Sequence, residues 1–344
     1  MQAATLREFG APLEVQDVPR PTPGADDVLI QVEACGVCHS DLHVADGDQP
    51  SLKAITKERV IPGHEVVGRV VEKGANVKHL GVGDRVGVAW LYSSCGECGP
   101  CREGRENLCR RQLVTGVMVD GGYAEYMVAR ASHALRVPDE LSAEEAAPLF
   151  CAGLTVYRSI KNAGVAAGQR VGIFGVGGLG HLAVQIAHAK GAHVVALDVD
   201  ASKLELARKL GAAEALNVTD ADAMKGLRKQ GLQVAVVTSA AKAAYDAAFR
   251  SLAPGGTLSV VGLPSEPLTF SALSLVGLEA RIVGSAVGTR DDMREVLALA
   301  AAGKLRCITE LQPLASVNKV FDRMRSGQIT GRVVLQCTAP GHAH

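Results

Sequence analysis

The chain has 344 residues, of which 47% are hydrophobic and 3% aromatic, and its 36 basic residues balance its 36 acidic residues. This length exceeds the size at which one hydrophobic core keeps growing, so we expect two domains. Because there is no net charge, no long basic run and little aromatic surface, nucleic acids and anionic membranes are poor candidate partners.

The amino-terminal residues predict neither a secretory signal nor a membrane anchor. The run MQAATLREFGAPLEVQDV alternates apolar and polar residues and carries charge early. The sequence also lacks the roughly 18 uninterrupted apolar residues of a spanning helix. The nine cysteines are grouped in a way that favours metal binding over disulfides. We therefore expect a cytoplasmic protein, with a disulfide-rich secreted protein as the alternative.

The pattern of predicted elements changes along the chain. Short apolar runs bounded by turn residues, such as DVLIQVEACGV, VVGRVVEKG and DRVGVAW, predict a mostly β domain over about the first 150 residues. From Gln169 onward, strand patterns such as RVGIFGV alternate with helical patterns such as GLGHLAVQIAHAKG. This alternation predicts a parallel, doubly wound sheet. After about Arg290, two helical patterns precede the strand-like run GRVVLQ.

Three separated residues in the first part of the chain could form an open zinc site. Cys38 lies in CGVCHSDLH, His64 in IPGHEVVG and Cys151 in PLFCAGLT. Three protein ligands with a fourth position left open are typical of catalytic zinc. A cysteine in an apolar segment is also commonly a buried filler, and Cys35 with Cys38 forms a C-x-x-C that could be a redox dithiol. Spacing alone does not decide between these interpretations.

A denser cysteine cluster follows in the run CGECGPCREGRENLC, whose four cysteines are Cys95, Cys98, Cys101 and Cys109. Four thiolates from one loop suit tetrahedral Zn²⁺ and leave no coordination position open, so this site is predicted to be structural. On its own, the loop would fit a zinc-ribbon binding module equally well.

A glycine-rich turn predicts the cofactor site. The run Gly175, Val176, Gly177, Gly178, Leu179, Gly180 fits G-x-G-x-x-G, follows a predicted strand and opens a helix. Such a helix N-terminus binds pyrophosphate. The next strand ends in Asp198, which can bind the ribose hydroxyls and would repel a 2′-phosphate, so we expect NAD over NADP. Lys203 could reach the same ribose or be an ordinary surface lysine.

Together these motifs resemble one family. CGVCHSDLH, GHEVVGRVVEKGANV, GDRVG, the four-cysteine loop, CAGLTVY and GVGGLG occur in the order found in zinc-containing medium-chain alcohol dehydrogenases, of which the chain is most similar to the microbial NAD-dependent branch. The resemblance implies an α/β fold with a GroES-like catalytic domain at 1–152, a Rossmann domain at 153–288 and a return to the catalytic domain at 289–344. It also implies a structural zinc lobe at about 91–112, two zincs per subunit, and a homodimer or homotetramer.

The resemblance also assigns roles to single residues. Cys38, His64 and Cys151 match the catalytic zinc ligands, and the four clustered cysteines match the structural ones. Ser40 and His43 match a proton relay, and Asp41 matches an acid that orients His64. Glu65 matches an acid behind the zinc, which either can exchange with the zinc's water ligand or is only a charge partner. The remaining matches are His39 and Arg332 at the cofactor phosphates, Thr155 at the nicotinamide, Ser285 and Val287 in the strand that receives the carboxamide, and Trp90 and Gln49 in the substrate pocket. By sequence alone, Arg332 could also be a surface charge.

The sequence therefore predicts a reversible oxidation of primary or secondary alcohols to aldehydes or ketones, in which zinc binds the alkoxide and hydride passes to NAD. Gln49 stands where the microbial branch often has tryptophan, and the segment before His64 is longer than usual. Both features predict a pocket for alcohols bulkier than ethanol. A polyol or formaldehyde-linked dehydrogenase is the alternative within the fold, and a non-catalytic, zinc-stabilised NAD(H)-binding protein is the alternative outside it.

Overall fold

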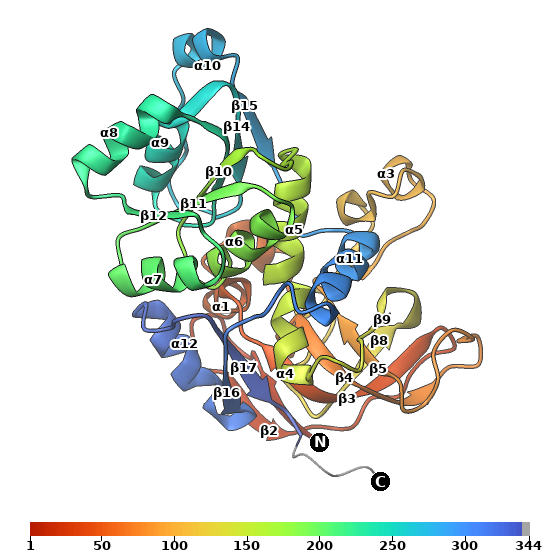
Figure 1. Cartoon of the computed structure of the whole chain (residues 1–344). Helices are drawn as coiled ribbons and strands as arrows, with labels where there is room; N and C mark the ends of the chain where they lie inside the picture. Colours follow the sequence, from red (N-terminus) through yellow and green to blue (C-terminus); the bar gives the residue numbers. More distant parts are fainter. Residues whose placement is uncertain (339–344) are drawn as a thin grey trace. The chain divides into compact units, whose positions relative to one another are not determined.

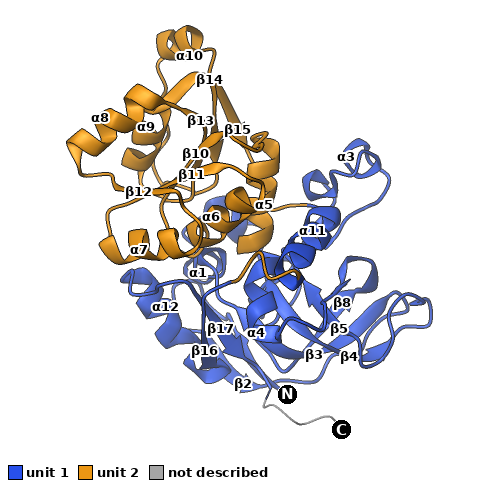
Figure 2. Cartoon of the chain, in the orientation of Figure 1, with its two compact units in different colours: residues 1–151, 289–301, 307–344 blue, residues 152–288, 302–306 orange. Residues whose placement is uncertain are grey.

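The computed structural model describes residues 1–338 and divides the chain into two compact units (Figures 1 and 2). Of the described residues, unit 1 contains 1–151, 289–301 and 307–338, and unit 2 contains 152–288 and 302–306. The sequence ranges placed 302–306 with the carboxy-terminal return, whereas the structure groups this short segment with unit 2. Within the described residues, no helix is long and apolar enough to span a membrane.

Unit 1 is built on a mostly antiparallel sheet in the order β16-β17-β3-β4-β5-β9, with β8 paired to β3. Its strands are β3 (Asp27–Gly36), β4 (Glu65–Lys73), β5 (Arg85–Val88), β8 (Tyr126–Arg130), β9 (Leu135–Arg136), β16 (Thr309–Pro313) and β17 (Arg332–Gln336). Two smaller sheets pair β1 (Gln2–Thr5) with β2 (Glu14–Asp17) and β6 (Leu91–Ser93) with β7 (Leu113–Val114). This sheet confirms a mostly β first part.

The register of this sheet gathers the candidate site. Gly36 at the end of β3 pairs with Glu65 at the start of β4, and Val334 of β17 pairs with Gly36 on the other side. Cys38 lies two residues after the end of β3 and His64 directly precedes β4, so both residues lie at the same end of the two strands. Arg332 begins the neighbouring strand β17. Residues far apart in the sequence therefore meet at one end of three adjacent strands.

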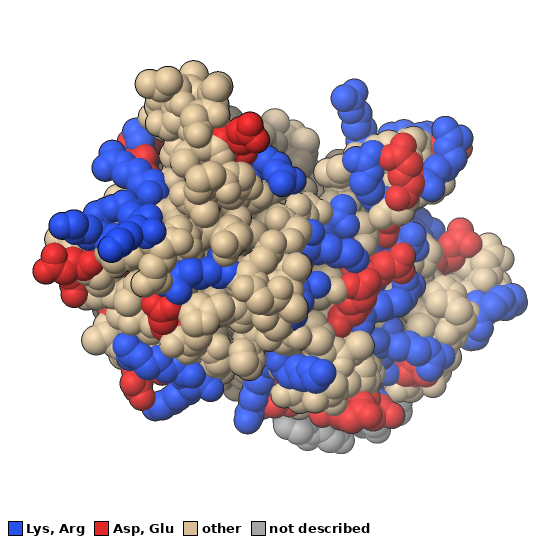
Figure 3. Space-filling view, turned by 45° about the horizontal axis from the view of Figure 1, so that its top comes forward, with Lys and Arg blue, Asp and Glu red and all other residues tan. Residues whose placement is uncertain are grey.

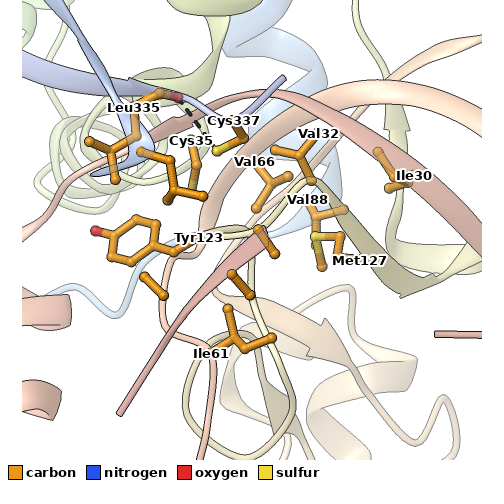
Figure 4. Packing of buried hydrophobic residues seen from close by; sticks show 14 of the residues in the cluster. Ile30, Val32, Cys35, Ile61, Val66, Val88, Tyr123, Met127, Leu335 and Cys337 are labelled. Carbon is orange, nitrogen blue, oxygen red and sulfur yellow. Dashed lines mark hydrogen bonds between the residues drawn. The ribbon is translucent and has the colours of Figure 1, made fainter. Parts of the chain in front are cut away.

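The core of unit 1 lies against this sheet. Figure 4 shows Cys35 and Cys337 packed among Val32, Val66 and Val88. Cys35 is fully buried, and burial raises its pKa well above the usual value. The cysteine that precedes Cys38 in the C-x-x-C run is therefore part of the hydrophobic core.

The helices of unit 1 are short and mainly connect strands. They are α1 (His39–Asp46), α2 (Pro50–Lys53), α3 (Gly99–Arg102), α4 (Ala143–Ala146), α11 (Arg290–Ala301) and α12 (Val317–Arg325), with 3₁₀ turns at Glu106–Leu108, Ala131–His133, Ala147–Phe150 and Leu314–Ser316. Helix α1 begins at a capping box between Cys38 and Asp41 and ends at Gly47, whose φ is 64°. The cap therefore fixes Asp41 within one helical turn of Cys38.

Unit 2 confirms the predicted parallel sheet, with strand order β12-β11-β10-β13-β14-β15 and every pair parallel. The strands are β10 (Arg170–Phe174), β11 (His193–Asp198), β12 (Glu214–Asn217), β13 (Leu232–Val237), β14 (Leu252–Val260) and β15 (Arg281–Gly284). The helices are α5 (Ala152–Asn162), α6 (Gly180–Ala189), α7 (Ala201–Lys209), α8 (Ala221–Gln230), α9 (Lys242–Arg250) and α10 (Ala272–Leu278). The strand order reverses beside β10, where such sheets bind ligands outside their carboxyl ends.

Charged side chains are mixed rather than separated by sign. On the face in Figure 3, basic and acidic residues are interspersed with uncharged ones. This arrangement agrees with the balance of 36 basic and 36 acidic residues in the sequence.

Candidate active site and metal centres

Cys38, His64 and Cys151 come together in unit 1. Their ligand atoms, with one carboxylate oxygen of Glu65, all lie within 4.8 Å of one another. The two sulfurs are 3.9 Å apart, and Zn–S bonds of about 2.3 Å at tetrahedral angles place two sulfurs about 3.8 Å apart. Nε2 of His64 is buried and has no hydrogen-bond partner among the described residues. An unpaired imidazole nitrogen beside two thiols fits a zinc ligand set.

The charges around the two thiols favour metal binding. A hydrogen bond from Cys151 holds the pKa of Cys38 well below its usual value, and His64 and Arg332 act in the same direction. One thiol of the pair is therefore readily available as the thiolate that a metal requires.

Asp41 holds the histidine ligand from behind. Its Oδ1 lies 2.7 Å from Nδ1 of His64, and its Oδ2 accepts a hydrogen bond of 2.9 Å from the backbone N–H of Cys38. Because an ionised carboxylate only accepts hydrogen bonds, it fixes the proton on Nδ1 and leaves Nε2 free for a metal.

Glu65 and Arg332 form a buried ion pair beside the cluster. Glu65 is 0% and Arg332 4% exposed, and the guanidinium donates to Oε1 of the glutamate. Burial raises the pKa of Glu65 to about 7, although Arg332 opposes this shift. Arg332 is therefore not a surface charge, whereas its contact with the cofactor phosphates stays a prediction.

Ser40 and His43 lie on α1, three residues apart and therefore on the same side of the helix. Ser40 Oγ is 3.8 Å from Cys38 Sγ, and His43 Nδ1 is 2.9 Å from Asp48 Oδ2. The serine thus adjoins the metal cluster, and the histidine side chain is 32% exposed. His39 begins the same helix, and burial lowers its pKa.

The two predicted pocket residues differ in position. The Trp90 ring meets the His64 ring edge to face, with 4.9 Å between their centroids. Trp90 therefore adjoins the metal cluster directly. Gln49 occupies the N-cap position of α2 without a side-chain capping hydrogen bond, and its place in the substrate pocket stays a prediction.

The four clustered cysteines also converge in unit 1. Cys95 Sγ lies 3.8 Å from Cys101 Sγ and 3.5 Å from Cys109 Sγ, and all four ligand atoms lie within 4.8 Å of one another. Backbone N–H groups of Glu97 and Cys98 lower the pKa of Cys95 to about 6. The donor set fits tetrahedral zinc without an open position.

In unit 2, the glycine-rich turn has the geometry that phosphate binding needs. Gly175 has a φ of 93°, which only glycine adopts readily. A Cβ on Gly180 would lie 1.8 Å from the Gly175 carbonyl oxygen, whereas a Cβ on Gly177 would meet no atom within 4 Å. Gly178 and Leu179 complete the turn, and Leu179 is the N-cap of α6. Gly175 and Gly180 are therefore required by the backbone of the turn itself, whereas Gly177 leaves space for a phosphate to approach the backbone.

Asp198 ends β11 beside this turn. Its Oδ2 accepts the Val176 N–H at 2.7 Å and its Oδ1 accepts the Val199 N–H at 2.8 Å. The carboxylate is thereby fixed where the ribose of a dinucleotide would approach. Lys203 lies in the first turn of α7, where its backbone N–H is capped by Asp200.

Three other predicted cofactor residues lie in unit 2. Thr155 is on α5, and Ser285 and Val287 follow β15. Val287 has a φ of 45°, which is strained for a β-branched residue, and the Ser285 hydroxyl is buried without a hydrogen-bond partner among the described residues. Their contacts with a nicotinamide stay predictions.

Comparison with known proteins supplies the family. Residues 24–139 match the alcohol dehydrogenase GroES-like domain and residues 178–302 match the zinc-binding dehydrogenase domain. An alcohol dehydrogenase of Geobacillus stearothermophilus is 49% identical over 338 residues, which cover 98% of this chain and 99% of that protein. The chain belongs to the zinc-binding medium-chain alcohol dehydrogenases. The predicted fold class, a GroES-like domain with a Rossmann-type parallel sheet, is confirmed.

Solved structures of the family include both nicotinamide cofactors. An acetophenone reductase from Geotrichum candidum in complex with NAD superimposes with a TM-score of 0.87 at 33% identity, covering 97% of this chain and 96% of its own. A zinc-binding dehydrogenase from Sinorhizobium meliloti bound to NADP gives a TM-score of 0.87 at 28% identity, covering 97% and 98%. The fold therefore accepts either cofactor.

Sequence reasoning missed two buried polar residues in this alcohol dehydrogenase. Glu106 is 5% exposed and accepts hydrogen bonds from the backbone N–H and Nε of Arg290, at 3.0 and 3.1 Å. Tyr123 is 0% exposed and donates to Asp41 at 3.0 Å. Glu106 lies inside the four-cysteine run and Tyr123 lies in the run GGYAEY. Their positions in these motifs were the only sequence features that could have marked them as buried polar residues.

Proposed function

We propose that this enzyme oxidises primary or secondary alcohols to aldehydes or ketones with NAD, reversibly, and that it holds two zinc ions per chain. The observation that carries the proposal is the unpaired, buried Nε2 of His64 beside the thiols of Cys38 and Cys151. A site with two sulfur ligands and one nitrogen ligand leaves a fourth position for substrate, whereas the four-cysteine site is closed.

Zinc held by Cys38, His64 and Cys151 would supply a Lewis acid that lowers the pKa of an alcohol hydroxyl, and NAD would take up the hydride from the carbinol carbon. The residues of the chain then have to remove one proton. Ser40 adjoins the cluster and is the hydroxyl that first accepts it, and His43 lies one helical turn further toward solvent.

Asp48 determines which nitrogen of His43 serves the relay. Its carboxylate only accepts hydrogen bonds, so Nδ1 of His43 carries a proton and Nε2 keeps the free lone pair. Nε2 is therefore the atom that takes the proton.

Asp198 supports NAD as the cofactor. Its carboxylate accepts hydrogen bonds from the backbone N–H groups of Val176 and Val199, which hold it where it would repel a 2′-phosphate. We expect kcat/KM for NAD to exceed that for NADP by at least about 10-fold, equivalent to about 1.4 kcal/mol. The substitution Asp198→Gly should narrow this ratio. An unchanged ratio would remove Asp198 from cofactor selection.

We expect the substrates to be alcohols bulkier than ethanol. Trp90 lies against the His64 ring, and Gln49 replaces a second indole expected in this branch. The test is kcat/KM for ethanol, benzyl alcohol, cyclohexanol and a polyol, read as NADH absorbance. A clear preference for ethanol would contradict the pocket assignment. NAD binding without an alcohol-dependent absorbance change would contradict the enzymatic proposal itself.

Self-association through unit 2 is part of the proposal. Strand β15 is an edge of the parallel sheet, and Leu273, Val276 and Ile282 on α10 and β15 are 83%, 76% and 37% exposed. An open strand edge with exposed apolar side chains favours pairing with a second copy. Light scattering should give the mass of a homodimer or homotetramer, and Val276→Lys should shift the mass toward the monomer.

The cysteines support a reducing cytoplasmic location. All nine are free, and six of them belong to the two candidate metal sites. Reduced thiols are kept available for metal binding in the cytosol.

A further inference from the structure

The segment Asp120–Tyr123 is hydrogen-bonded to the segment Ile61–His64, which carries the histidine ligand. Asp120 Oδ1 accepts the Ile61 N–H at 3.1 Å, and the Gly121 N–H donates to the Ile61 carbonyl at 2.6 Å. The N–H groups of Gly122 and Tyr123 donate to the carbonyls of residues 63 and 62, at 2.9 and 3.0 Å. Four hydrogen bonds between two short stretches of chain therefore set where His64 lies.

The glycines of both segments are required by this close approach. A Cβ on Gly121 would lie 2.1 Å from the Gly63 carbonyl oxygen, and a Cβ on Gly122 would lie 2.4 Å from Val66. Gly63 has a φ of 97°, and a Cβ there would lie 2.5 Å from the Tyr123 ring. The ring of Tyr123 thus lies directly over the residue that precedes His64.

The Tyr123 hydroxyl completes the hydrogen bonding of Asp41. Oδ1 of Asp41 faces His64 Nδ1 at 2.7 Å and the Gly63 N–H at 3.2 Å. Oδ2 accepts from the Cys38 N–H at 2.9 Å and from the Tyr123 hydroxyl at 3.0 Å. Two donors on each oxygen prevent the carboxylate from rotating, so Oδ1 stays aimed at the histidine.

Burial keeps this hydroxyl a donor. Tyr123 is 0% exposed, and burial together with the Asp41 charge raises its pKa well above the usual value. The raised pKa favours the protonated phenol, whose hydroxyl donates to the carboxylate.

We propose that Tyr123 is a positioning residue for the metal ligand His64, and that it acts through Asp41. The inference rests on the proposed catalytic zinc. With the phenol hydroxyl gone, Oδ2 keeps only the Cys38 N–H, the carboxylate gains rotational freedom, and His64 presents Nε2 to the metal less accurately. Removing a direct partner of a ligating histidine costs about 10- to 100-fold in metal affinity, so a residue one step further away should cost about 3- to 10-fold.

The test is the rate of zinc release from the full-length enzyme to a coloured chelator, measured for Tyr123→Phe. This variant keeps the ring and its packing and removes only the hydroxyl. The catalytic phase is the one that Cys151→Ala lacks. We expect that phase to be 3- to 10-fold faster in Tyr123→Phe, with the structural phase unchanged.

Tyr245→Phe is the matched control, because Tyr245 is equally buried and its hydroxyl donates to the Gly262 carbonyl within unit 2. It should release both zincs at the wild-type rates. If the two phenylalanine variants lose the same thermal stability and only Tyr123→Phe changes zinc release, general destabilisation is excluded as the cause.

A double-mutant cycle with Asp41→Asn tests whether Tyr123 acts through Asp41. Asp41→Asn alone should speed catalytic zinc release more than Tyr123→Phe, and adding Tyr123→Phe should change the rate by less than about twofold. Two outcomes would overturn the proposed role of Tyr123. One is that the two substitutions multiply each other's effects on the rate of catalytic zinc release, and the other is that Tyr123→Phe releases this zinc at the wild-type rate. A wild-type enzyme that releases only one zinc would overturn the two-zinc proposal and this inference together.

Discussion

The two cysteine clusters of unit 1 use the same kind of ligand in opposite settings. Cys95, Cys98, Cys101 and Cys109 come from one short loop, and three of the four are partly exposed. Cys38, His64 and Cys151 come from three separate segments and lie with Glu65 in a buried site. Four sulfurs from a loop close a site, whereas two sulfurs and a nitrogen in a shielded site leave a position for chemistry.

The two clusters also differ in which groups of the protein surround them, backbone groups in one and charged side chains in the other. Cys95 Sγ in the exposed cluster accepts the backbone N–H of Cys98 at 3.4 Å. The buried cluster is surrounded by side chains, with Asp41 on His64 and the Glu65–Arg332 pair behind it. Backbone donors hold a loop in shape, whereas charged side chains tune a metal and its substrate. The comparison therefore predicts that one cluster controls stability and the other turnover.

The largest expected effect is at the buried cluster. Cys151→Ala should lower turnover by at least about 1000-fold, because the Lewis acid contributes several kcal/mol to the reaction. Metal analysis should find one zinc per chain instead of two. Cys337→Ala, a buried cysteine outside both clusters, should keep two zincs and most of the activity. Two zincs in Cys151→Ala would show that the ligand assignment is wrong.

The exposed cluster should respond in the opposite way. Cys98→Ser should lower Tm by roughly 10 °C, since the binding energy of a structural metal is folding energy. At temperatures well below this Tm, kcat should stay within about threefold of wild type. Thermal unfolding and initial rates on the same preparation check both statements. A large loss of kcat in the folded variant would show that the four-cysteine cluster also controls turnover.

A smaller effect should appear on acidification near the exposed cluster. His133 is 6% exposed, its Nε2 lies 3.1 Å from Ser94 Oγ, and burial lowers its pKa to about 4. Its unfolded pKa is about 6.5, so the unfolded state binds more protons between these values and stability falls as pH drops through this range. The loss should reach about 2 kcal/mol by pH 5.

The control for this effect is His133→Asn, which removes the titrating group. Between pH 7 and pH 5, the Tm of the wild type should fall several degrees further than that of the variant. Parallel pH dependences for the two proteins would show that His133 does not link protonation to stability.

The smallest of these effects concerns the proton path from the buried cluster. His43→Ala should slow turnover about 10-fold near pH 7 and less at higher pH, where solution bases replace the relay. The measurement is the pH–rate profile with a fixed alcohol and saturating NAD. Imidazole added to the buffer should restore part of the rate. An unchanged profile would remove His43 from the relay.

The features that sequence could predict were the local ones. The four cysteines and the glycine-rich turn are each confined to one short run, and helices α11 and α12 and strand β17 follow their patterns because their apolar periodicity is clear. The family resemblance named Cys38, His64 and Cys151, which spacing alone left undecided. The register of β3 and β4 brings Cys38 and His64 together, and Cys151 joins them from the end of the 3₁₀ turn Ala147–Phe150.

The contacts that sequence could not predict join distant positions. Glu106 and Arg290 are 184 positions apart, and Asp41 and Tyr123 are 82 apart. Each pairing depends on the fold to bring a buried carboxylate to its donor, and no local pattern encodes it. The burial of Arg332 beside Glu65 is of the same kind, because the run GRVVL by itself fits an exposed strand end.

The most direct test is to withdraw zinc stepwise from the wild-type enzyme with a chelator and to measure NADH formation from benzyl alcohol and NAD at each zinc content. We expect two zincs per chain at the start and activity that falls in proportion to the loss of one of them. Activity that persists after both zincs are removed, or that is absent while both are bound, would contradict a catalytic zinc at Cys38, His64 and Cys151.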